Sequence, residues 1–149
     1  MLHTLSPELL HRPVRVIVVG CGGNGSAIVA GLPYLHQALL VYGHEGGLEV
    51  TLIDGDVVSP TNCVRQPFSH AEIGHPKTVV LVSRVNLFWG LKWHAVPENF
   101  SSQTNVDRAD IVVGCVDSRA ARKAIAEKVT GRRSSVSYWR LYKRSRLCV

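Results

Sequence analysis

A cluster of glycines follows the first apolar segment of the chain. Residues 14–19 read Val-Arg-Val-Ile-Val-Val, and the glycines come directly afterwards at Gly20, Gly22, Gly23 and Gly25. A buried strand that runs through a tight glycine turn into a helix presents backbone N–H groups to a phosphate. Nucleotide and dinucleotide sites share this pattern, so the spacing predicts a phosphate ligand without distinguishing between the two.

A carboxylate stands at the end of the second apolar segment. Residues 48–53 form that segment, and Asp54 follows it in the sequence Asp-Gly-Asp. At the carboxyl end of a strand, a carboxylate can accept hydrogen bonds from both hydroxyls of a ribose. The alternative is a solvated aspartate in a turn, and the residue type alone does not decide between them. Asp56 is a further nucleotide-binding candidate, interpreted as a turn residue or as an acidic neighbour of the site.

Cationic and amide side chains follow in the loop region 57–75 and at the start of the next predicted helix. They are Asn62, Arg65, Gln66 and Lys77. A triphosphate needs several fixed cations and donors, which arginine and lysine provide with different geometries. Lys77 also opens a predicted helix, where the helix dipole favours an anion. Taken singly, Arg65 and Lys77 would be solvated surface charges, but their place in a loop facing the glycine turn favours phosphate binding.

Asp117 follows the fourth predicted strand, which covers residues 111–116. A carboxylate there, beside bound phosphates, suits a Mg²⁺ ion that keeps most of its waters. The alternative is a helix N-cap, a part that either Asp117 or Ser118 can play. The sequence therefore makes Asp117 the candidate metal ligand and, together with Arg65 and Lys77, a candidate catalytic residue.

These candidate residues are positioned by alternating strands and helices. Strands are predicted at 14–19, 48–53, 93–96 and 111–116, and helices from about 24 to 43, at 77–88 and at 118–129. Strands that are apolar on both faces and alternate with helices predict an α/β, Rossmann-like fold, with a mainly parallel sheet and helices on both faces. In such a sheet the ligand binds at the carboxyl ends of the strands, where the candidates lie.

Three local features carry specific expectations. Pro33 is expected to kink the first helix or to end its first part. Residues 57–75 are expected to be irregular, because prolines and a glycine punctuate them. The last helix is expected to have Ser118 as its N-cap. Its inner face is expected to hold Ala120, Ala121, Ala124 and Ile125.

Length and charge indicate one domain with a basic tail. The chain has 149 residues, of which 46% are apolar and 19% charged, as expected of a globular domain. We expect a lead-in at 1–13, a nucleotide-binding domain at 14–130 and a tail at 131–149. Removing the six basic residues of the tail from the 17 Lys and Arg leaves 11, which balance the 11 acids of the remainder. The net charge therefore belongs to the tail, which argues against a nucleic-acid partner for the folded body.

Several classes of protein and site are disfavoured. No apolar run approaches the ~18 residues of a membrane-spanning helix, and residues 1–13 lack the layout of a signal peptide. We therefore expect a cytoplasmic protein without a membrane partner. The four cysteines form no Cys-x-x-Cys pair, so a zinc site is not expected, and their spacing marks none of them as a nucleophile.

An NAD-dependent oxidoreductase is the alternative within the same fold class. Gly20-x-Gly22-x-x-Gly25 matches the dinucleotide fingerprint, and Asp54 ends the second strand. However, Asp54 follows Gly20 by 34 residues, more than the ~20 of that fingerprint. Hydride transfer also gives no reason for a cluster of cations after the second strand. The pattern favours ATP over NAD.

Together these motifs resemble the ThiF/MoeB superfamily, which includes the ubiquitin-activating enzymes. The glycine stretch is similar to its G-x-G-G-x-G loop, residues 54–56 to its D-x-D, and residues 62–66 to its N-x-x-R-Q. Residues 74–77 are similar to its G-x-x-K, and residues 115–117 contain the counterpart of its metal-binding aspartate. The resemblance covers residues 14–129. The amino-acid sequences of several segments are also similar to those of the ThiF proteins of PRTRC gene clusters.

The resemblance implies an ATP-dependent adenylyltransferase. A carboxylate, often the C-terminus of a ubiquitin-like or sulfur-carrier-like protein, would attack the α-phosphorus of ATP, and pyrophosphate would leave. The roles that it implies are ribose binding for Asp54, phosphate binding for Arg65 and Lys77, additional hydrogen bonds from Asn62 and Gln66, and magnesium binding for Asp117. Members of the family commonly act as dimers, so a homodimer is also implied.

The chain departs from the family pattern at both ends. Many members carry an arginine segment before the first strand, whereas residues 1–13 hold only Arg12. A paired Cys-x-x-Cys and a recognisable thioester cysteine are also absent. After residues 137–139, Ser-Tyr-Trp, the family pattern gives way to a basic run, which leads us to expect a truncated or frame-shifted C-terminus. A non-catalytic nucleotide-binding remnant is therefore the second hypothesis.

Overall fold

A computed structural model describes residues 7–130 and 137–140 of the chain. Its strands are β1 (Val14–Val19), β2 (Leu48–Ile53), β3 (His94–Val96), β4 (Ile111–Gly114) and β5 (Ser137–Arg140). Its α-helices are α1 (Gly23–Val41), α2 (Asn62–Arg65), α3 (Lys77–Trp89) and α4 (Arg119–Thr130), and two 3-10 helices lie at Pro7–Leu10 and His70–Glu72. No helix in the described part of the chain is both long and apolar enough to span a membrane.

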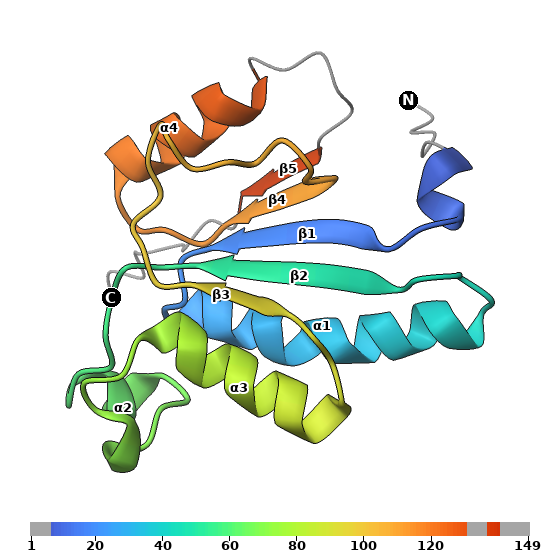
Figure 1. Ribbon diagram of the computed structural model, residues 1–149. Helices are drawn as coiled ribbons and strands as arrows, with labels where there is room; N and C mark the ends of the chain where they lie inside the picture. Colours follow the sequence, from blue (N-terminus) through green and yellow to red (C-terminus); the bar gives the residue numbers. More distant parts are fainter. Residues whose placement is uncertain (1–6, 131–136, 141–149) are drawn as a thin grey trace, which may run out of the picture.

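The five strands form one sheet in the order β3-β2-β1-β4-β5, and every neighbouring pair is parallel. Helices α1 and α3 cover one face and α4 covers the other (Figure 1). The predicted α/β, Rossmann-like fold is therefore confirmed. Because all the strands are parallel, their carboxyl ends lie along one edge of the sheet. The chain passes from β1 to β2 and β3 on one side and then continues with β4 and β5 on the other side of β1, so the strand order reverses at β1.

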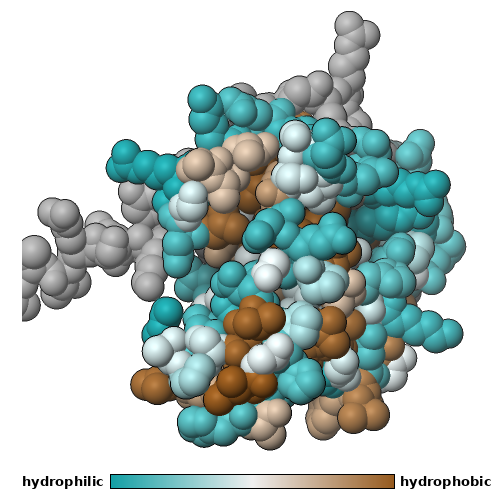
Figure 2. Space-filling model, turned by 60° about the vertical axis from the view of Figure 1, so that its left-hand side comes forward, coloured by the Kyte–Doolittle hydropathy of each residue, from teal (hydrophilic) through white to brown (hydrophobic). Residues whose placement is uncertain are grey.

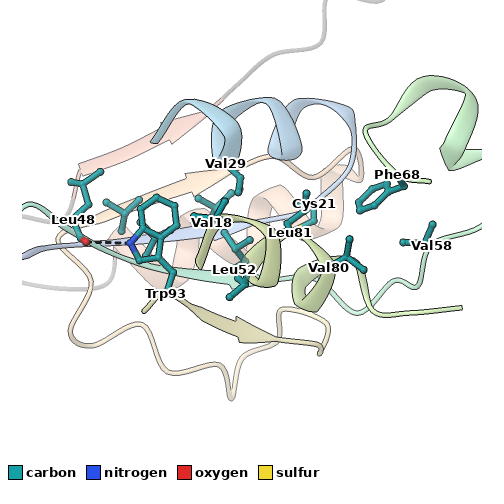
Figure 3. Close-up of a cluster of buried hydrophobic side chains, with 14 residues drawn as sticks. Val18, Cys21, Val29, Leu48, Leu52, Val58, Phe68, Val80, Leu81 and Trp93 are labelled. Carbon is teal, nitrogen blue, oxygen red and sulfur yellow. Dashed lines mark hydrogen bonds between the residues drawn. The ribbon is translucent and has the colours of Figure 1, made fainter. Parts of the chain in front are cut away.

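The face covered by α1 and α3 holds the larger cluster of buried apolar side chains (Figure 3). Val18 and Leu52 come from the central strands, Val29 reaches them from α1, and none of the three is more than 1% exposed. Full burial of a side chain of this kind stabilises the fold by about 1.5–3 kcal/mol. Trp93 closes the cluster, and its indole N–H donates to the Leu48 carbonyl oxygen at 3.3 Å. This packing fixes where the first turn of α1 lies.

The opposite face is covered by α4 and by the connection between β3 and β4. Ile17 and Val112 from the sheet pack there with Ile125 of α4. The connection, residues 97–110, has no helix anywhere along its fully described length, although a helix usually joins parallel strands. It leaves a cavity of about 510 Å³ over β1 and β2, which we call the crossover cavity.

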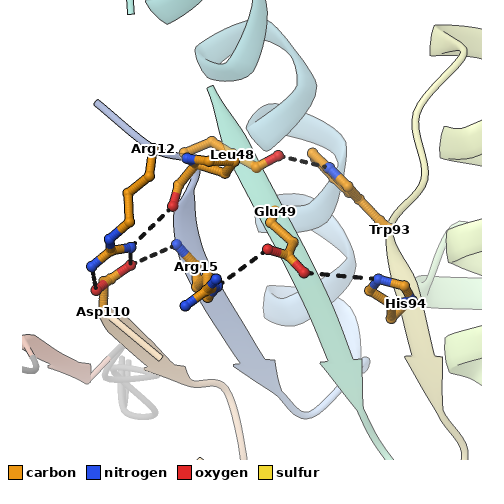
Figure 4. Close-up of polar contacts among 8 residues, drawn as sticks. Arg12, Arg15, Leu48, Glu49, Trp93, His94 and Asp110 are labelled. Atoms are coloured by element: carbon orange, nitrogen blue, oxygen red, sulfur yellow. Dashed lines mark hydrogen bonds and ion pairs between the residues drawn. The ribbon is translucent and has the colours of Figure 1, made fainter. Parts of the chain in front are cut away.

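Charged side chains lie on this face near the amino ends of the strands (Figure 4). Arg15 Nε lies 3.3 Å from Glu49 Oε2, and His94 Nε2 lies 3.9 Å from Glu49 Oε1. Both terminal nitrogens of Arg12 donate to the Asp110 carboxylate at 2.7 Å. Burial raises the pKa of Asp110, but hydrogen bonds from Arg12 and from the backbone N–H of Arg15 outweigh it, so the pKa lies below its ordinary value. Arg12 is thus engaged within its own chain.

The structure differs from the sequence-based expectations at three places. Pro33 does not end the first part of α1, which continues to Val41, because tertiary packing of the helix outweighs the loss of one backbone hydrogen bond; the kink expected as the other outcome stays a prediction. Residues 57–75, expected to be irregular, contain α2 and a 3-10 helix. β4 ends at Gly114 rather than at residue 116, and the next residues turn into the wall of a cleft.

The sheet also extends beyond the predicted nucleotide-binding domain. Strand β5 lies within the segment 131–149, which was expected to be a basic tail, and it pairs with β4 from Ser137 to Arg140. The remainder of that segment, 131–136 and 141–149, lies outside the described residues, as do residues 1–6.

Candidate functional site

A cleft of about 1030 Å³ opens at the carboxyl edge of the sheet. The ends of β1, β2 and β4 form its floor, and the first residues of α1, α3 and α4 lie around it. Figure 2 turns this edge of the molecule forward, and hydrophobic side chains gather in its lower half, on the side of α2 and α3. The predicted site residues that line the cleft are Gly20, Gly22, Gly23, Asp54, Asp56, Asn62, Arg65, Gln66, Lys77 and Asp117.

Two glycines of the loop are required by steric fit. Gly20 adopts a φ of +95°, and a Cβ on it would lie 3.0 Å from the Cys115 carbonyl carbon. Gly25, which does not line the cleft, packs against the loop from α1, where a Cβ would lie 1.8 Å from the Gly20 carbonyl oxygen. Any side chain at Gly25 would therefore push α1 away from the loop.

The other two glycines face open space. A Cβ on Gly23 would meet no atom within 4 Å, and one on Gly22 would meet only Gln66 Nε2 at 4.0 Å. No side chain caps the N-terminus of α1, whose N-cap is Gly22. The first backbone N–H groups of a helix lack intrahelical partners and carry partial positive charge. Here they lie beside the open part of the cleft, in an arrangement that suits an anion.

Asp54 joins two turns through its carboxylate. One oxygen accepts a hydrogen bond from the backbone N–H of Cys21, next to Gly20. The other accepts from the backbone N–H of Asp56 at 2.8 Å. Each carboxylate oxygen has a second acceptor position, so Asp54 can hold these turns and still accept a hydroxyl from a ligand.

Lys77 and Asp56 form an ion pair at the start of α3. Lys77 Nζ lies 2.8 Å from Asp56 Oδ2, with the Lys77 side chain 6% exposed and the Asp56 side chain 66% exposed. The sequence placed both residues near the site but did not predict their pairing. Their contact keeps the ammonium group of a nearly buried lysine beside a counterion.

The segment around α2 brings three predicted residues to the opposite wall. Asn62 is buried, and its Oδ1 accepts from the Ser59 N–H at 2.9 Å, so at least this oxygen shapes the turn. Arg65 is exposed and lines the cleft. The Gln66 Oε1 atom is buried and has no hydrogen-bond partner among the described residues. An unpaired buried oxygen is unfavourable, and a ligand N–H or hydroxyl in the cleft would satisfy it.

Asp117 projects from the third side of the cleft, at the start of α4. Its carbonyl oxygen accepts from Arg122 Nη2 at 2.7 Å, and its carboxylate accepts no hydrogen bond from the described residues. Ser118 Oγ accepts from the Ala121 N–H at 3.2 Å, so Ser118 is the N-cap, as expected, and Asp117 is available to a ligand. No group of three or more His, Cys, Asp or Glu side chains in the described part of the chain could hold a metal by itself.

The cysteines near the cleft are unsuited to nucleophilic chemistry. Burial raises the pKa of Cys115 to about 11. Cys21 is fully buried, and burial followed by the negative charge of Asp54 raises its pKa as well. Both thiols are therefore protonated near neutral pH, and the thiolate is the reactive form.

Several residues that line the cleft were missed by the sequence reasoning. Asn99 and Phe100 reach it from the 97–110 connection, and Asn99 lies so close to Gly55 that a Cβ there would meet its Oδ1 at 2.5 Å. The glycine at position 55 is the only sequence signal for this approach. Of the residues expected on the inner face of α4, Ile125 lies in the core. The others, Ala120, Ala121 and Ala124, line the cleft.

Comparison with known proteins gives a consistent result. The sequence model of the ThiF family matches residues 8–137 of the chain. A search of curated proteins finds no significant match.

Solved structures share the fold. The chain is similar to E. coli tRNA N6-threonylcarbamoyladenosine dehydratase, TcdA, in complex with ATP, with 23% sequence identity and a TM-score of 0.63 over 84% of this chain and 50% of that one. The structure of TcdA in complex with AMP gives 24% identity and a TM-score of 0.62, over 85% and 49% of the two chains. E. coli MccB with MccA gives 26% identity and a TM-score of 0.58, over 76% and 33%. The chain thus spans about half the length of the TcdA structures.

Proposed function

Because the chain belongs to the ThiF family, we propose that its cleft binds ATP and transfers the adenylyl group to a carboxylate, with release of pyrophosphate. The observation that carries the proposal is the convergence of an uncapped helix N-terminus, Asp54, Lys77, Arg65 and Asp117 around one cleft. These groups come from separate elements of the chain and match the needs of a ribose and a chain of phosphates.

The proposed orientation of ATP follows from the distribution of side chains. The phosphates lie against Gly22 and Gly23, between the cations Arg65 and Lys77. The ribose hydroxyls bind Asp54. The base lies toward the apolar end of the cleft, where the purine ring contacts Phe100 and the alanines of α4, and the Asn99 amide is available to its polar edge. The TcdA structures with ATP and AMP support a nucleotide as ligand.

Asp117 is proposed as the protein ligand of Mg²⁺. The Asp117 carboxylate fits an ion that binds through one or two carboxylates, phosphate oxygens and waters, and it does not fit a metal held by protein groups alone. When bound, Mg²⁺ neutralises phosphate charge and so assists departure of pyrophosphate.

The reaction needs positioning and charge stabilisation from this chain rather than a general base. A carboxylate is already ionised at neutral pH, so its oxygen can attack the α-phosphorus directly. A bond forms from that oxygen to phosphorus, the bond from the α-phosphorus to the bridging oxygen breaks, and the electron pair leaves with pyrophosphate. Arg65 and Lys77 hold the phosphates as charge moves onto the leaving group.

The carboxylate is proposed to be the C-terminus of a ubiquitin-like or sulfur-carrier-like protein, in a homodimeric, cytoplasmic enzyme of the PRTRC type. The structure of MccB with selenomethionine-labelled MccA contains a second polypeptide, which supports a peptide or protein as substrate. A nucleotide-binding protein without catalysis is the second candidate, because the groups that converge on the cleft account for nucleotide binding by themselves.

Two measurements test the proposal. Calorimetric titration should show ATP binding that is strengthened by Mg²⁺. Lys77→Ala should weaken this binding at least about ten-fold, and Asp117→Asn should remove the effect of Mg²⁺. Arg108→Ala and Glu98→Gln, which line the crossover cavity, are matched controls and should leave binding unchanged. If Lys77→Ala and Asp117→Asn also leave it unchanged, the assignment of the site is wrong.

Exchange of labelled pyrophosphate into ATP tests the catalytic step. Label should enter ATP only when a carboxylate partner is present, because exchange requires formation and reversal of the acyl adenylate. ATP binding without exchange for any protein partner or small carboxylate would favour the non-catalytic alternative.

A further inference from the structure

Asp56 and Lys77 are joined by their backbones as well as by their side chains. The Lys77 N–H donates to the Asp56 carbonyl oxygen at 3.0 Å, in addition to the side-chain contact at 2.8 Å. Val57 and Pro76 form an antiparallel bridge beside them. The carboxylate of Asp56 is therefore fixed relative to the first turn of α3, and the position of the lysine ammonium group is fixed with it.

The same aspartate is connected to the glycine loop. Its N–H donates to Asp54 Oδ1 at 2.8 Å, and the other oxygen of Asp54 accepts from the N–H of Cys21. A continuous series of hydrogen bonds thus runs from the loop after β1, through the turn after β2, to Lys77. Asp56 therefore connects the glycine loop with Lys77, the two parts of the site that are expected to contact phosphate groups.

The two side chains differ in their exposure to water. The Lys77 side chain is 6% exposed, so its charge is poorly solvated and needs a partner. The Asp56 side chain is 66% exposed, so water and salt screen its repulsion of a polyphosphate. An ammonium group has three N–H donors. One donor to Asp56 leaves two for phosphate oxygens.

We propose that Asp56 is a positioning residue that holds the Lys77 ammonium group at the phosphate end of the cleft before the nucleotide arrives. In this role Asp56 does not bind the nucleotide. The proposal rests on the proposed function, because it requires phosphates at this end of the cleft. Lysine has four side-chain torsions to restrict, and holding them in advance lowers the entropy lost on binding.

Calorimetric titrations of ATP and of adenosine test this role, with and without Mg²⁺. Asp56→Ala should weaken ATP binding about ten-fold and leave adenosine binding unchanged, because adenosine has no phosphate for Lys77 to contact. Asp56→Asn keeps an acceptor oxygen and should lose less than Asp56→Ala. In a Lys77→Ala background, Asp56→Ala should cause no further loss, because the residue acts through the lysine.

The control is Glu127→Ala, which also removes the acidic partner of a lysine, since Lys123 Nζ lies 3.6 Å from Glu127 Oε1 on α4. Glu127→Ala should leave the binding of ATP and of adenosine unchanged. Equal losses for ATP and adenosine, or a full additional loss in the Lys77→Ala background, would overturn the positioning role in favour of a structural one. The Asp56→Asn variant gives the same comparison if Asp56→Ala does not fold. Absence of ATP binding to the unaltered protein would instead overturn the proposed function.

Discussion

The cleft at the carboxyl edge and the crossover cavity are both large enough for a small ligand, but their charged groups are arranged differently. In the cleft, Lys77 pairs with Asp56, but the Arg65 guanidinium and the Asp117 carboxylate project from loops and helix ends and form no ion pair within the described part of the chain. In the crossover cavity, Arg15 and Glu49 face each other across β1 and β2 and form an ion pair. Glu98 and Arg108 add charges of both signs at its rim.

This difference follows from where each hollow lies on the strands. Side chains within a strand are placed opposite their neighbours by the register, so oppositely charged groups can pair with each other. Beyond the carboxyl ends, each strand passes into a loop, and side chains from several loops meet around a common space. Volume is thus a weaker indicator of a site than the convergence of groups that still have capacity to bind.

The largest expected effect separates the two kinds of glycine in the segment 20–25. Gly25→Ala should destabilise the fold by about 3 kcal/mol or more, because the new Cβ would overlap the Gly20 carbonyl oxygen. Gly23→Ala should change the free energy of unfolding by less than about 1 kcal/mol but weaken ATP binding, because its methyl group occupies the open part of the cleft. Urea unfolding and ATP titration distinguish the two. Equal stability of both variants would contradict the steric account.

The next effect compares the two hollows directly by filling each with a ring. Ala124→Phe would occupy the apolar end of the cleft and should weaken ATP binding about ten-fold or more. Gln103→Phe places the same ring in the crossover cavity and should leave ATP binding unchanged. Both variants are first compared by thermal unfolding to establish that they fold. If Gln103→Phe weakens ATP binding as much as Ala124→Phe, the two hollows are not functionally separate.

The smallest effect concerns the contact between the 3-10 helix His70–Glu72 and α3 at low pH. Hydrogen bonds from the Arg84 side chain, opposed by burial and helped by the Ser69 N–H, lower the pKa of Glu72 to about 2. Because this pKa is lowered in the folded state, the stabilisation is present above the ordinary value near 4.5 and is lost as the pH falls toward 2. The Arg84 side chain is 42% exposed, so screening limits the contribution to about 1 kcal/mol.

Urea unfolding of the unaltered protein and of Glu72→Gln checks this expectation. The variant should be less stable at pH 7, and the difference between the two proteins should shrink as the pH falls from about 4.5 toward 2. A difference that is constant over this range would contradict a role for the ionised carboxylate.

The sequence predicted those parts of the fold and the site that have a repeating or terminal signal. The bounds of β1 and β2 agreed with their apolar, β-branched runs. Asp54 and Asp117 were found because each follows a strand in a parallel sheet. Their roles toward a nucleotide stay predictions.

The parts that were missed have no such signal. Asn99 and Phe100 belong to a connection without helical periodicity, and Gly55 shows only that some group approaches it, without identifying which. Ala124 has the residue type of a packed helix face, but its surroundings depend on how α4 sits on the sheet. The pairing of Asp56 with Lys77 depends on the path of residues 57–75, which contain short helices that were not expected.

The two hydrogen bonds of Asp54 affect how the recognition of the sugar can be measured. Replacement of this aspartate would release the Cys21 N–H and the Asp56 N–H, so the glycine loop and the lysine would shift together with any loss of a ribose contact. The contact is better isolated by altering the ligand. Titration of the unaltered protein with 2′-deoxy-ATP and 3′-deoxy-ATP removes one hydroxyl at a time while the protein scaffold stays intact.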